Sequence, residues 1–246
     1  MVPDPMHFDG LAASYAEARP PYPAPLWRDV LATGLVAPGR RALDLGAGSG
    51  EATKELLDHG MDVVAVEPGA KLAALLKERL PRATVIRARA EDIDPDSASF
   101  DLVVAATSIH WMDLGAVLPI VHRSLIAGGR LLVWRNVFGD HAADITPFRH
   151  EVERIVTRRG VVRPGKPEDV EATAEKLAES GLFTIDHITR YSWAIDLTTE
   201  QIRTLFGTFS DWTPSEVDQA ASAVDALGGL VSEHYTSWLI SAIPER

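Results

Sequence analysis

Short apolar runs alternate with amphipathic stretches over residues 41–137. Five runs carry apolar residues on both faces, as the strands of a parallel sheet do when helices cover both of its sides. These runs are 41–45, 61–67, 83–88, 100–106 and 130–137. Helical patterns occupy 51–60, 69–80 and 113–129. Strands that alternate with helices at this spacing predict a doubly wound, mostly parallel α/β sheet with right-handed crossovers. Gly60 and the pair Gly128–Gly129 are expected to end their helices in left-handed C-caps, and the middle helix should stop before Pro81.

After residue 137 the pattern changes to helical segments placed between two further strands. Apolar and polar residues predict strands at 183–197 and 235–243. Helical patterns cover 167–181, 198–209 and 213–227. We therefore predict a single domain, 1–246, with a core formed by about 36–137, 176–196 and 234–244. The remaining segments, 1–35, 138–175 and 197–233, are expected to form a helical cap.

The stretch "ALDLGAGSGEAT" (42–53) places three glycines, Gly46, Gly48 and Gly50, directly after the first predicted strand. Glycine lets the backbone turn sharply and lets a ligand lie against it, near the partly positive N-terminus of the next helix. The spacing G-x-G-x-G differs from the G-x-G-x-x-G of dinucleotide loops. Asp44 precedes the loop, and its carboxylate would repel a pyrophosphate but suits a cation or an ammonium group. A tight turn that binds nothing would also explain these glycines.

Acidic residues follow the second and third predicted strands. Glu67 stands about 20 residues beyond the loop, where a carboxylate binds the hydroxyls of a ribose in dinucleotide-binding folds. Stabilisation of the next helix by an acid near its N-terminus is the alternative interpretation. Ala90, Glu91 and Asp92 follow the third strand, where backbone amides and a carboxylate can bind the edge of an adenine. A solvated acidic loop would give the same sequence.

Composition narrows the classes of partner. The formal net charge of −11 disfavours nucleic acids, because a negative field repels phosphate backbones. The chain has no cysteine, and its His, Asp and Glu residues lack metal-ligand spacing, so we predict no metal. No apolar run approaches the roughly 18 residues of a membrane span. The first residues lack the pattern of a secretory signal. We expect a cytoplasmic protein that binds small molecules rather than a membrane.

Five motifs carry a resemblance to a known family. They are "ALDLGAGSG", "VVAVEPG", "RARAEDID", "FDLVVAATSIHWMD" and "AGGRLLVWRNV". Their order and spacing resemble those of the class I S-adenosylmethionine-dependent methyltransferases. Within these, the chain is most similar to the methyltransferase type 11 group, which includes enzymes similar to trans-aconitate methyltransferase. The segment "FDGLAASYAEARPPYP" (8–23) also resembles the lead-in helix of that group.

The resemblance implies S-adenosylmethionine as the cofactor and a seven-stranded sheet whose last strand is antiparallel. Asp44 would lie near the amino group of the cofactor, Glu67 would bind the ribose hydroxyls, and Ala90 and Glu91 would face the adenine. Arg89 stands where many members have Asp, so Glu91 must supply the acid. The implied cofactor-binding residues are Tyr15, Arg19, Tyr22, Asp44, Gly46, Ala47, Gly48, Gly50, Glu67, Pro68, Leu72, Ala90, Glu91, Ala106 and Thr107. Packing of an N-terminal helix is the alternative role for the aromatic residues that precede the core.

Methyl transfer from an activated sulfonium needs mainly positioning and desolvation. A base is required only when the acceptor must lose a proton. His110 follows the fourth predicted strand and could act as that base or orient the acceptor; packing beneath the cofactor is the alternative. Candidates for the acceptor pocket are Trp111, Trp134, Arg135, Asn136 and Trp212. Trp111 could instead be a wall against adenosine, and the later aromatic residues could form a small core beneath a cap.

We therefore predict S-adenosylmethionine-dependent methyl transfer to a small-molecule acceptor, such as a carboxylate or a hydroxyl. A nicotinamide-dependent oxidoreductase is one alternative, disfavoured by the spacing of the glycines. A non-catalytic module that binds the cofactor as a sensor is another, and only activity separates it from an enzyme. The sequence leaves the acceptor, the atom methylated and the oligomeric state open.

Overall fold

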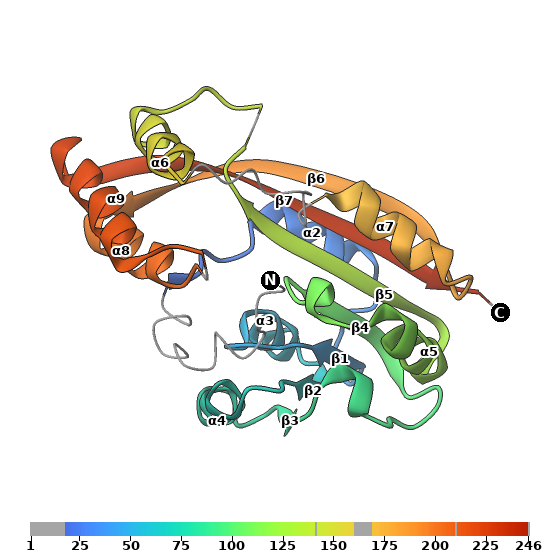
Figure 1. The fold of residues 1–246 in the computed structure, drawn as a ribbon. Coiled ribbons are helices and arrows are strands. Elements are labelled where there is room, and N and C mark those ends of the chain that lie inside the picture. The colour runs from blue at the N-terminus through green and yellow to red at the C-terminus, as the bar shows by residue number, and fades with distance from the viewer. Residues whose placement is uncertain (1–17, 141, 160–168, 210, 246) are drawn as a thin grey trace. The chain divides into compact units, whose positions relative to one another are not determined.

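The computed structural model describes residues 18–140, 142–159, 169–209 and 211–245 (Figure 1). The chain divides into two compact units. Unit 1 comprises Met1–Pro20, Val137–Lys166 and Ser192–Thr236. Unit 2 comprises Pro21–Asn136, Pro167–Tyr191 and Ser237–Arg246. The core and cap boundaries inferred from the sequence stay a prediction.

Seven strands form one sheet, in the order β3-β2-β1-β4-β5-β7-β6. The strands are β1 (Arg41–Leu45), β2 (Asp62–Val66), β3 (Thr84–Ile86), β4 (Phe100–Ala106), β5 (Leu125–Phe138), β6 (Phe183–Thr198) and β7 (Leu230–Pro244). β1 pairs in parallel with β2 and β4, β2 with β3, and β4 with β5. β7 runs antiparallel: Arg130 bonds Ser241 and, further along β5, Asn136 bonds the earlier Ser237. The predicted α/β fold class, including the antiparallel last strand, is confirmed.

The parallel register brings the carboxyl ends of β1, β2 and β4 to one edge of the sheet. Leu45 lies opposite Val66 of β2, and Asp44 lies opposite Val104 of β4. The residues that follow these strands therefore meet, although they are far apart in sequence. Ligands of open α/β sheets bind at this edge.

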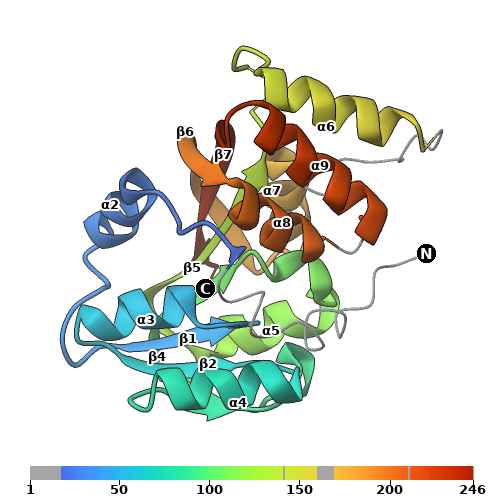
Figure 2. The same ribbon diagram turned by 90° about the vertical axis from the view of Figure 1, so that its left-hand side faces the viewer.

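Unit 2 surrounds its part of the sheet with helices. They are α2 (Ala24–Ala32), α3 (Glu51–Asp58), α4 (Ala70–Arg79), α5 (Leu114–Ser124), α7 (Val170–Glu179) and the short 3₁₀ turns η2 (Ala90–Asp92) and η3 (Ile109–Trp111). Figure 2 shows α3 and α4 running beside β1 and β2. Leu56 and Leu57 of α3 and Leu76 of α4 are buried, because each helix turns an apolar stripe towards the strands. Among the described residues, no helix has the length and apolar character that a membrane span requires.

One predicted helix end is wrong. The helical pattern was expected to continue to Gly128–Gly129, but α5 ends at Ser124 and β5 begins at Leu125. The pairing of β5 with β4 jumps from Leu125 opposite Phe100 to Arg130 opposite Leu102, so the residues between form an irregular bulge. A Cβ on Gly129 would lie 3.0 Å from the carbonyl oxygen of Asp101. The two glycines therefore allow this bulge and do not cap a helix.

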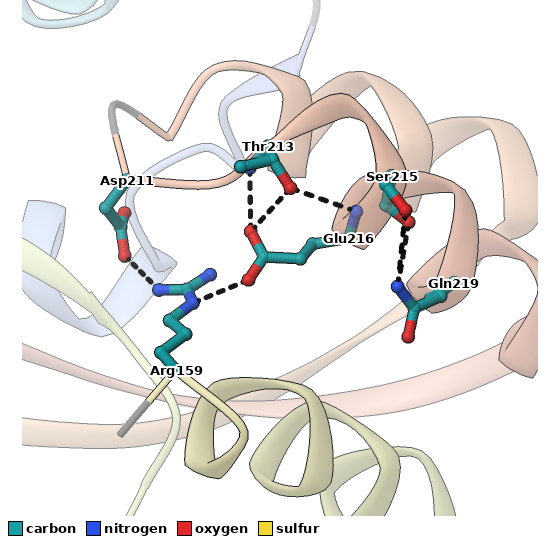
Figure 3. Close-up of polar contacts among 6 residues, drawn as sticks. All are labelled: Arg159, Asp211, Thr213, Ser215, Glu216 and Gln219. Atoms are coloured by element: carbon teal, nitrogen blue, oxygen red, sulfur yellow. Dashed lines mark hydrogen bonds and ion pairs between the residues drawn. The ribbon is translucent and has the colours of Figure 1, made fainter. Parts of the chain in front are cut away.

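Unit 1 has a separate hydrophobic core, built by α6 (Pro147–Thr157), α8 (Thr199–Gly207) and α9 (Pro214–Ala226). Phe148, Ile202 and Phe206 are buried in it. Arg159 follows α6 and joins the segment before α9: its guanidinium bonds Asp211 and Glu216 at 2.8 Å each (Figure 3). Thr213 caps α9 in a reciprocal capping box with Glu216, so these contacts fix where α9 begins.

Candidate functional site

The glycine loop links β1 to α3 and depends on backbone angles that favour glycine. Gly46, Gly48 and Gly50 have φ angles of 67°, 57° and 94°. A Cβ on Gly46 would lie 2.6 Å from the Cβ of Ser108, so the loop also packs too closely for a larger residue. Gly50 is the N-cap of α3, which places the loop at the N-terminus of that helix.

Asp44 is a buried carboxylate directly before this loop. One of its oxygens accepts a hydrogen bond of 2.6 Å from the Thr53 hydroxyl on α3. The other oxygen, Oδ1, is buried and has no hydrogen-bond partner among the described residues. Burial raises the pKa of Asp44 to about 7, partly opposed by the Thr53 hydrogen bond. A buried acceptor without a partner is costly, and a ligand N–H or ammonium group would satisfy it.

Glu67 is in direct contact with the glycine loop. Its carboxylate accepts the Gly48 amide at 2.9 Å and the Gly69 amide at 2.8 Å. The side chain is therefore fixed between the loop and the turn that precedes α4. The two features that the sequence singled out, loop and acid, lie side by side at the carboxyl edge of the sheet.

The segment after β3 forms the turn η2. Ala90 is buried, and the Glu91 carboxylate accepts the Asp113 amide at 2.8 Å and the Arg89 guanidinium N–H at 3.3 Å. Hydrogen bonds to the charged form lower the pKa of Glu91, although partial burial opposes them. Leu72, the predicted adenosine neighbour on α4, is buried, and Pro68 is half-buried.

Thr107 follows β4 in a left-handed conformation, with a φ angle of 58° that is unusual for a β-branched residue. Its amide donates to the Trp134 carbonyl at 2.7 Å, and its hydroxyl lies 3.0 Å from the Tyr22 hydroxyl. Ser108 then donates to the Leu45 carbonyl at 2.6 Å, which ties the end of β4 to the end of β1. Strained backbone of this kind clusters at functional sites. The sequence motifs indicate Tyr22 and Thr107 but not Ser108, since a serine after a strand is too common to be diagnostic.

His110 lies on η3, where its ring is 4.8 Å from that of Trp111. Removal of solvent around the imidazole lowers the pKa of His110, and the nearby Arg135 cation lowers it further. Together they hold this pKa well below its usual value. The imidazole is therefore neutral near pH 7 and can accept a hydrogen bond. It is a weak base in this environment.

The remaining candidates lie in both units. Trp134 is fully buried between the rings of Tyr22 and Trp27, and Asn136 bonds the Pro21 carbonyl and the Ser237 hydroxyl. In unit 1, Arg19 stacks on Phe209, and Trp212 packs against Phe206. Ala47 and Ala106 border the loop and the end of β4. Tyr15 lies outside the described residues. The functional roles of all these residues stay predictions.

Residues 43–133, which include the glycine loop, Glu67 and β4, match the methyltransferase domain family. This segment is similar to known methyltransferase domains. The matched residues include Asp44, Glu91 and Thr107, whereas Tyr22 and Trp134 lie outside them. The trans-aconitate subgroup is not distinguished by the match and stays a prediction.

Several proteins similar to this chain are named as methyltransferases. The "uncharacterized methyltransferase Mb3374" of Mycobacterium bovis is 41% identical over 132 residues, 53% of each chain. The chain thus spans about half the length of the curated relatives that it first matches. A candidate type II methyltransferase from Anaeromyxobacter dehalogenans has a similar fold, with a TM-score of 0.62, 24% identity and coverage of 93% and 97% of the two chains. The phosphoethanolamine N-methyltransferase 2 of Haemonchus contortus, solved with S-adenosylhomocysteine, has a TM-score of 0.51 at 18% identity, over 89% of this chain and 53% of its own.

Proposed function

We propose that unit 2 binds S-adenosylmethionine at the carboxyl edge of β1, β2 and β4, and that the chain transfers its methyl group to a small-molecule acceptor. One observation carries the proposal: the buried Asp44 Oδ1 lacks a partner beside a glycine loop whose Gly48 amide bonds Glu67. An ammonium group at Asp44 and ribose hydroxyls at Glu67 would match these acceptors. The methyltransferase domain match over the same residues supports this interpretation.

The bound cofactor would supply a methyl group already activated on its sulfonium. The protein then has to bind the cofactor and the acceptor, orient them and exclude water from them. In this proposal Gly46, Ala47, Gly48 and Gly50 border the methionyl part, and Pro68 and Leu72 flank the adenosine. Ala90 and Glu91 face the adenine, while Ala106 and Thr107 border the reacting centre. An acceptor such as a carboxylate would need no base, and a hydroxyl would.

His110 would orient an acceptor by accepting its hydrogen bond, because its low pKa leaves the imidazole neutral. The test compares turnover of wild type and His110→Ala. A fall in kcat with unchanged cofactor affinity supports the role in turnover. An unchanged kcat removes His110 from the site and leaves it a packing role.

Binding of the cofactor can be tested by calorimetry with S-adenosylmethionine, S-adenosylhomocysteine and NAD. We expect both sulfur compounds to bind and NAD not to bind. Glu67→Gln should weaken binding about tenfold or more, because it removes the charge that binds the ribose hydroxyls. Glu78→Gln, at an exposed position on α4, is the matched control and should leave affinity unchanged. Binding of NAD alone would favour the oxidoreductase alternative.

The acceptor requires a separate experiment. We would screen turnover of S-adenosylmethionine with small carboxylic acids, phenols and amines. Product formation with one class defines the acceptor chemistry. Cofactor binding without turnover over the whole screen would favour the sensor alternative over the enzyme.

A further inference from the structure

A threonine of α3 contacts the buried carboxylate of the proposed cofactor site. Thr53 lies in the first turn of α3, which begins after the N-cap Gly50. Its hydroxyl donates a hydrogen bond of 2.6 Å to Asp44 Oδ2, and both residues are 0% exposed. Water therefore has no access to this contact. The Thr53 hydroxyl, and not solvent, determines how the Asp44 carboxylate is oriented.

The same hydrogen bond leaves the other carboxylate oxygen for a ligand. Asp44 Oδ1 is buried and has no hydrogen-bond partner among the described residues. Because Thr53 already donates to Oδ2, an N–H group of a ligand would bind at Oδ1. A buried acceptor without a partner is costly, so this oxygen indicates a missing donor.

The charges around Asp44 favour a positive donor. The charged groups with the largest effects on Asp44 are the carboxylates of Glu51, at the start of α3, and Glu67, after β2. On the neighbouring strands β2 and β4, the residues opposite Asp44 are Ala65 and Val104. These neighbours bring no positive charge to the buried carboxylate. An ammonium group would supply one and so stabilise the ionised form of Asp44.

Thr53 also affects whether Asp44 carries a charge. Burial has the largest effect and raises the pKa of Asp44 to about 7. The hydrogen bond from the Thr53 hydroxyl lowers this pKa, and the Thr53 backbone amide lowers it by a smaller amount. The hydroxyl therefore stabilises the ionised form that an ammonium group requires. Without the hydroxyl, Asp44 would keep its proton to a higher pH.

We propose that Thr53 is a positioning residue for the cofactor: its hydroxyl holds Asp44 so that Oδ1 accepts a hydrogen bond from the ammonium group. This role rests on the proposed function and adds to it a residue that acts through Asp44. Where Asp44 carries a proton before binding, that proton is released to solvent when the ammonium group binds, because the cation pairs with the ionised carboxylate.

The first test uses the wild-type protein and two ligands, with calorimetry at each pH. S-adenosylhomocysteine has the ammonium group, and 5′-methylthioadenosine has the same adenosine and thioether without the amino-acid part. The affinity for S-adenosylhomocysteine should increase about tenfold from pH 6 to pH 8, because the ionised fraction of a group with a pKa of about 7 increases by that factor. The affinity for 5′-methylthioadenosine should stay nearly constant, since no cation then depends on Asp44.

The second test removes the hydroxyl. Thr53→Val keeps a similar shape, and we expect its affinity for S-adenosylhomocysteine at pH 7 to fall about fivefold or more, with the midpoint of the pH profile raised by about one unit or more. Its affinity for 5′-methylthioadenosine should not change. Thr53→Ser restores a hydroxyl and should recover the wild-type midpoint. Thr84→Val, at an exposed position on β3, is the matched control and should behave like wild type.

A merely structural role of Thr53 predicts a different result. Thr53→Val would then weaken both ligands equally at every pH, with an unchanged midpoint, and the proposal would be overturned. Thr53→Ala provides the same comparison if Thr53→Val does not fold. A wild-type affinity for S-adenosylhomocysteine that is constant between pH 6 and pH 8 would also overturn the proposal, whether or not any variant folds. Binding of neither ligand to the wild type would instead contradict the proposed cofactor site itself.

Discussion

The most informative residue is Asp44, because its position is costly without a ligand. A carboxylate that is fully buried, with one hydrogen bond and an unpartnered oxygen, is poorly stabilised in its charged form. Proteins retain such groups where function requires them. The folded protein therefore binds a proton at Asp44 over a pH range in which the unfolded chain has released it.

Asp44→Asn should change the pH dependence of stability. The pKa of Asp44 is about 7 in the folded state and 3.8 in a free side chain. The contribution of Asp44 to the free energy of unfolding is therefore greatest below pH 4 and falls as the pH rises to 7. Each pKa unit corresponds to about 1.4 kcal/mol. Asparagine cannot ionise, so the variant should gain about 1–3 kcal/mol relative to wild type between pH 5 and pH 7.5. Urea unfolding at both pH values, without ligands, measures this difference.

An exposed residue provides the control. Asp62→Asn, at an exposed position on β2, should show the same difference from wild type at both pH values. If the difference in unfolding free energy between Asp44→Asn and wild type did not vary with pH, burial would not raise the pKa of Asp44 as described.

At the residue scale the sequence identifies groups whose spacing along the chain is diagnostic. Asp44 and Glu67 could be selected because both stand at fixed offsets from glycines and strands. Thr53 and Ser108 could not, since their roles depend on hydrogen bonds to Asp44 and to Leu45, 63 positions away from Ser108. Local sequence does not specify which distant carbonyl a serine will meet.

At the scale of elements, the connection between β1 and α3 depends on glycine for two reasons. Gly46 has a positive φ angle, and a Cβ there would lie 2.6 Å from Ser108 Cβ. Gly34 also has a positive φ angle, 69°, but a Cβ there would meet nothing within 4 Å. Comparing alanine variants at the two positions therefore separates the cost of a left-handed backbone from the cost of a steric clash.

Gly46→Ala should be more destabilising than Gly34→Ala. Gly34→Ala incurs the left-handed backbone cost alone, about 1–2 kcal/mol. Gly46→Ala adds the collision and moves the loop, so we expect a further loss of stability and weakened binding of S-adenosylhomocysteine. Thermal unfolding and calorimetry of both variants measure this. Equal stability and unchanged binding in the two variants would show that the loop tolerates a side chain.

The contacts before α9 provide a second prediction at this scale. Arg159 joins α6 to Asp211 and Glu216, is only 17% exposed and stacks 5.0 Å from the Trp212 ring (Figure 3). Arg159→Gln should reduce the free energy of unfolding by about 1–3 kcal/mol, because two charge-assisted hydrogen bonds are lost in partly buried surroundings. Arg154→Gln is the control: its pair with Glu151 on the same helix is exposed, and its loss should cost about 0–0.5 kcal/mol. Chemical denaturation measures the free energy of unfolding of both variants. Similar losses in the two would show that the Arg159 contacts stabilise the protein no more than a surface ion pair does.

The limits of sequence-based prediction are also clearest among elements. Apolar runs located β1 and β4 at their observed bounds, because buried parallel strands have few polar residues. The sequence predicts a helix end at Gly128–Gly129, where the structure has a bulge, since a glycine with positive φ is common in both. The first residues of β7 were missed because the buried Glu233 interrupts the apolar pattern that marks a strand.

At the scale of the whole molecule, the sheet order joins residues that the chain keeps far apart. β5 pairs with β7, although α6, α7, β6, α8 and α9 lie between them in the sequence. The parallel half of the sheet could be derived from the spacing of strands and helices. The last strand could be located from its apolar residues, but its antiparallel direction was implied only by the resemblance to a family. Pairing over such distances is specified by packing of many residues rather than by a local pattern.

The cofactor proposed for unit 2 gives a prediction for the complete chain. S-adenosylhomocysteine should slow hydrogen exchange at amides of 46–50 and 67–69 in unit 2, and should leave local exchange in α9 of unit 1 unchanged. A ligand at 100 times its Kd stabilises the form that binds it by about 2.7 kcal/mol, and amides that exchange by local opening report the site that is covered. Exchange measured by mass spectrometry, with and without the ligand, tests this. If the ligand protected α9 and not the glycine loop, or protected no local amide, the assignment of its site to the carboxyl edge of unit 2 would be wrong.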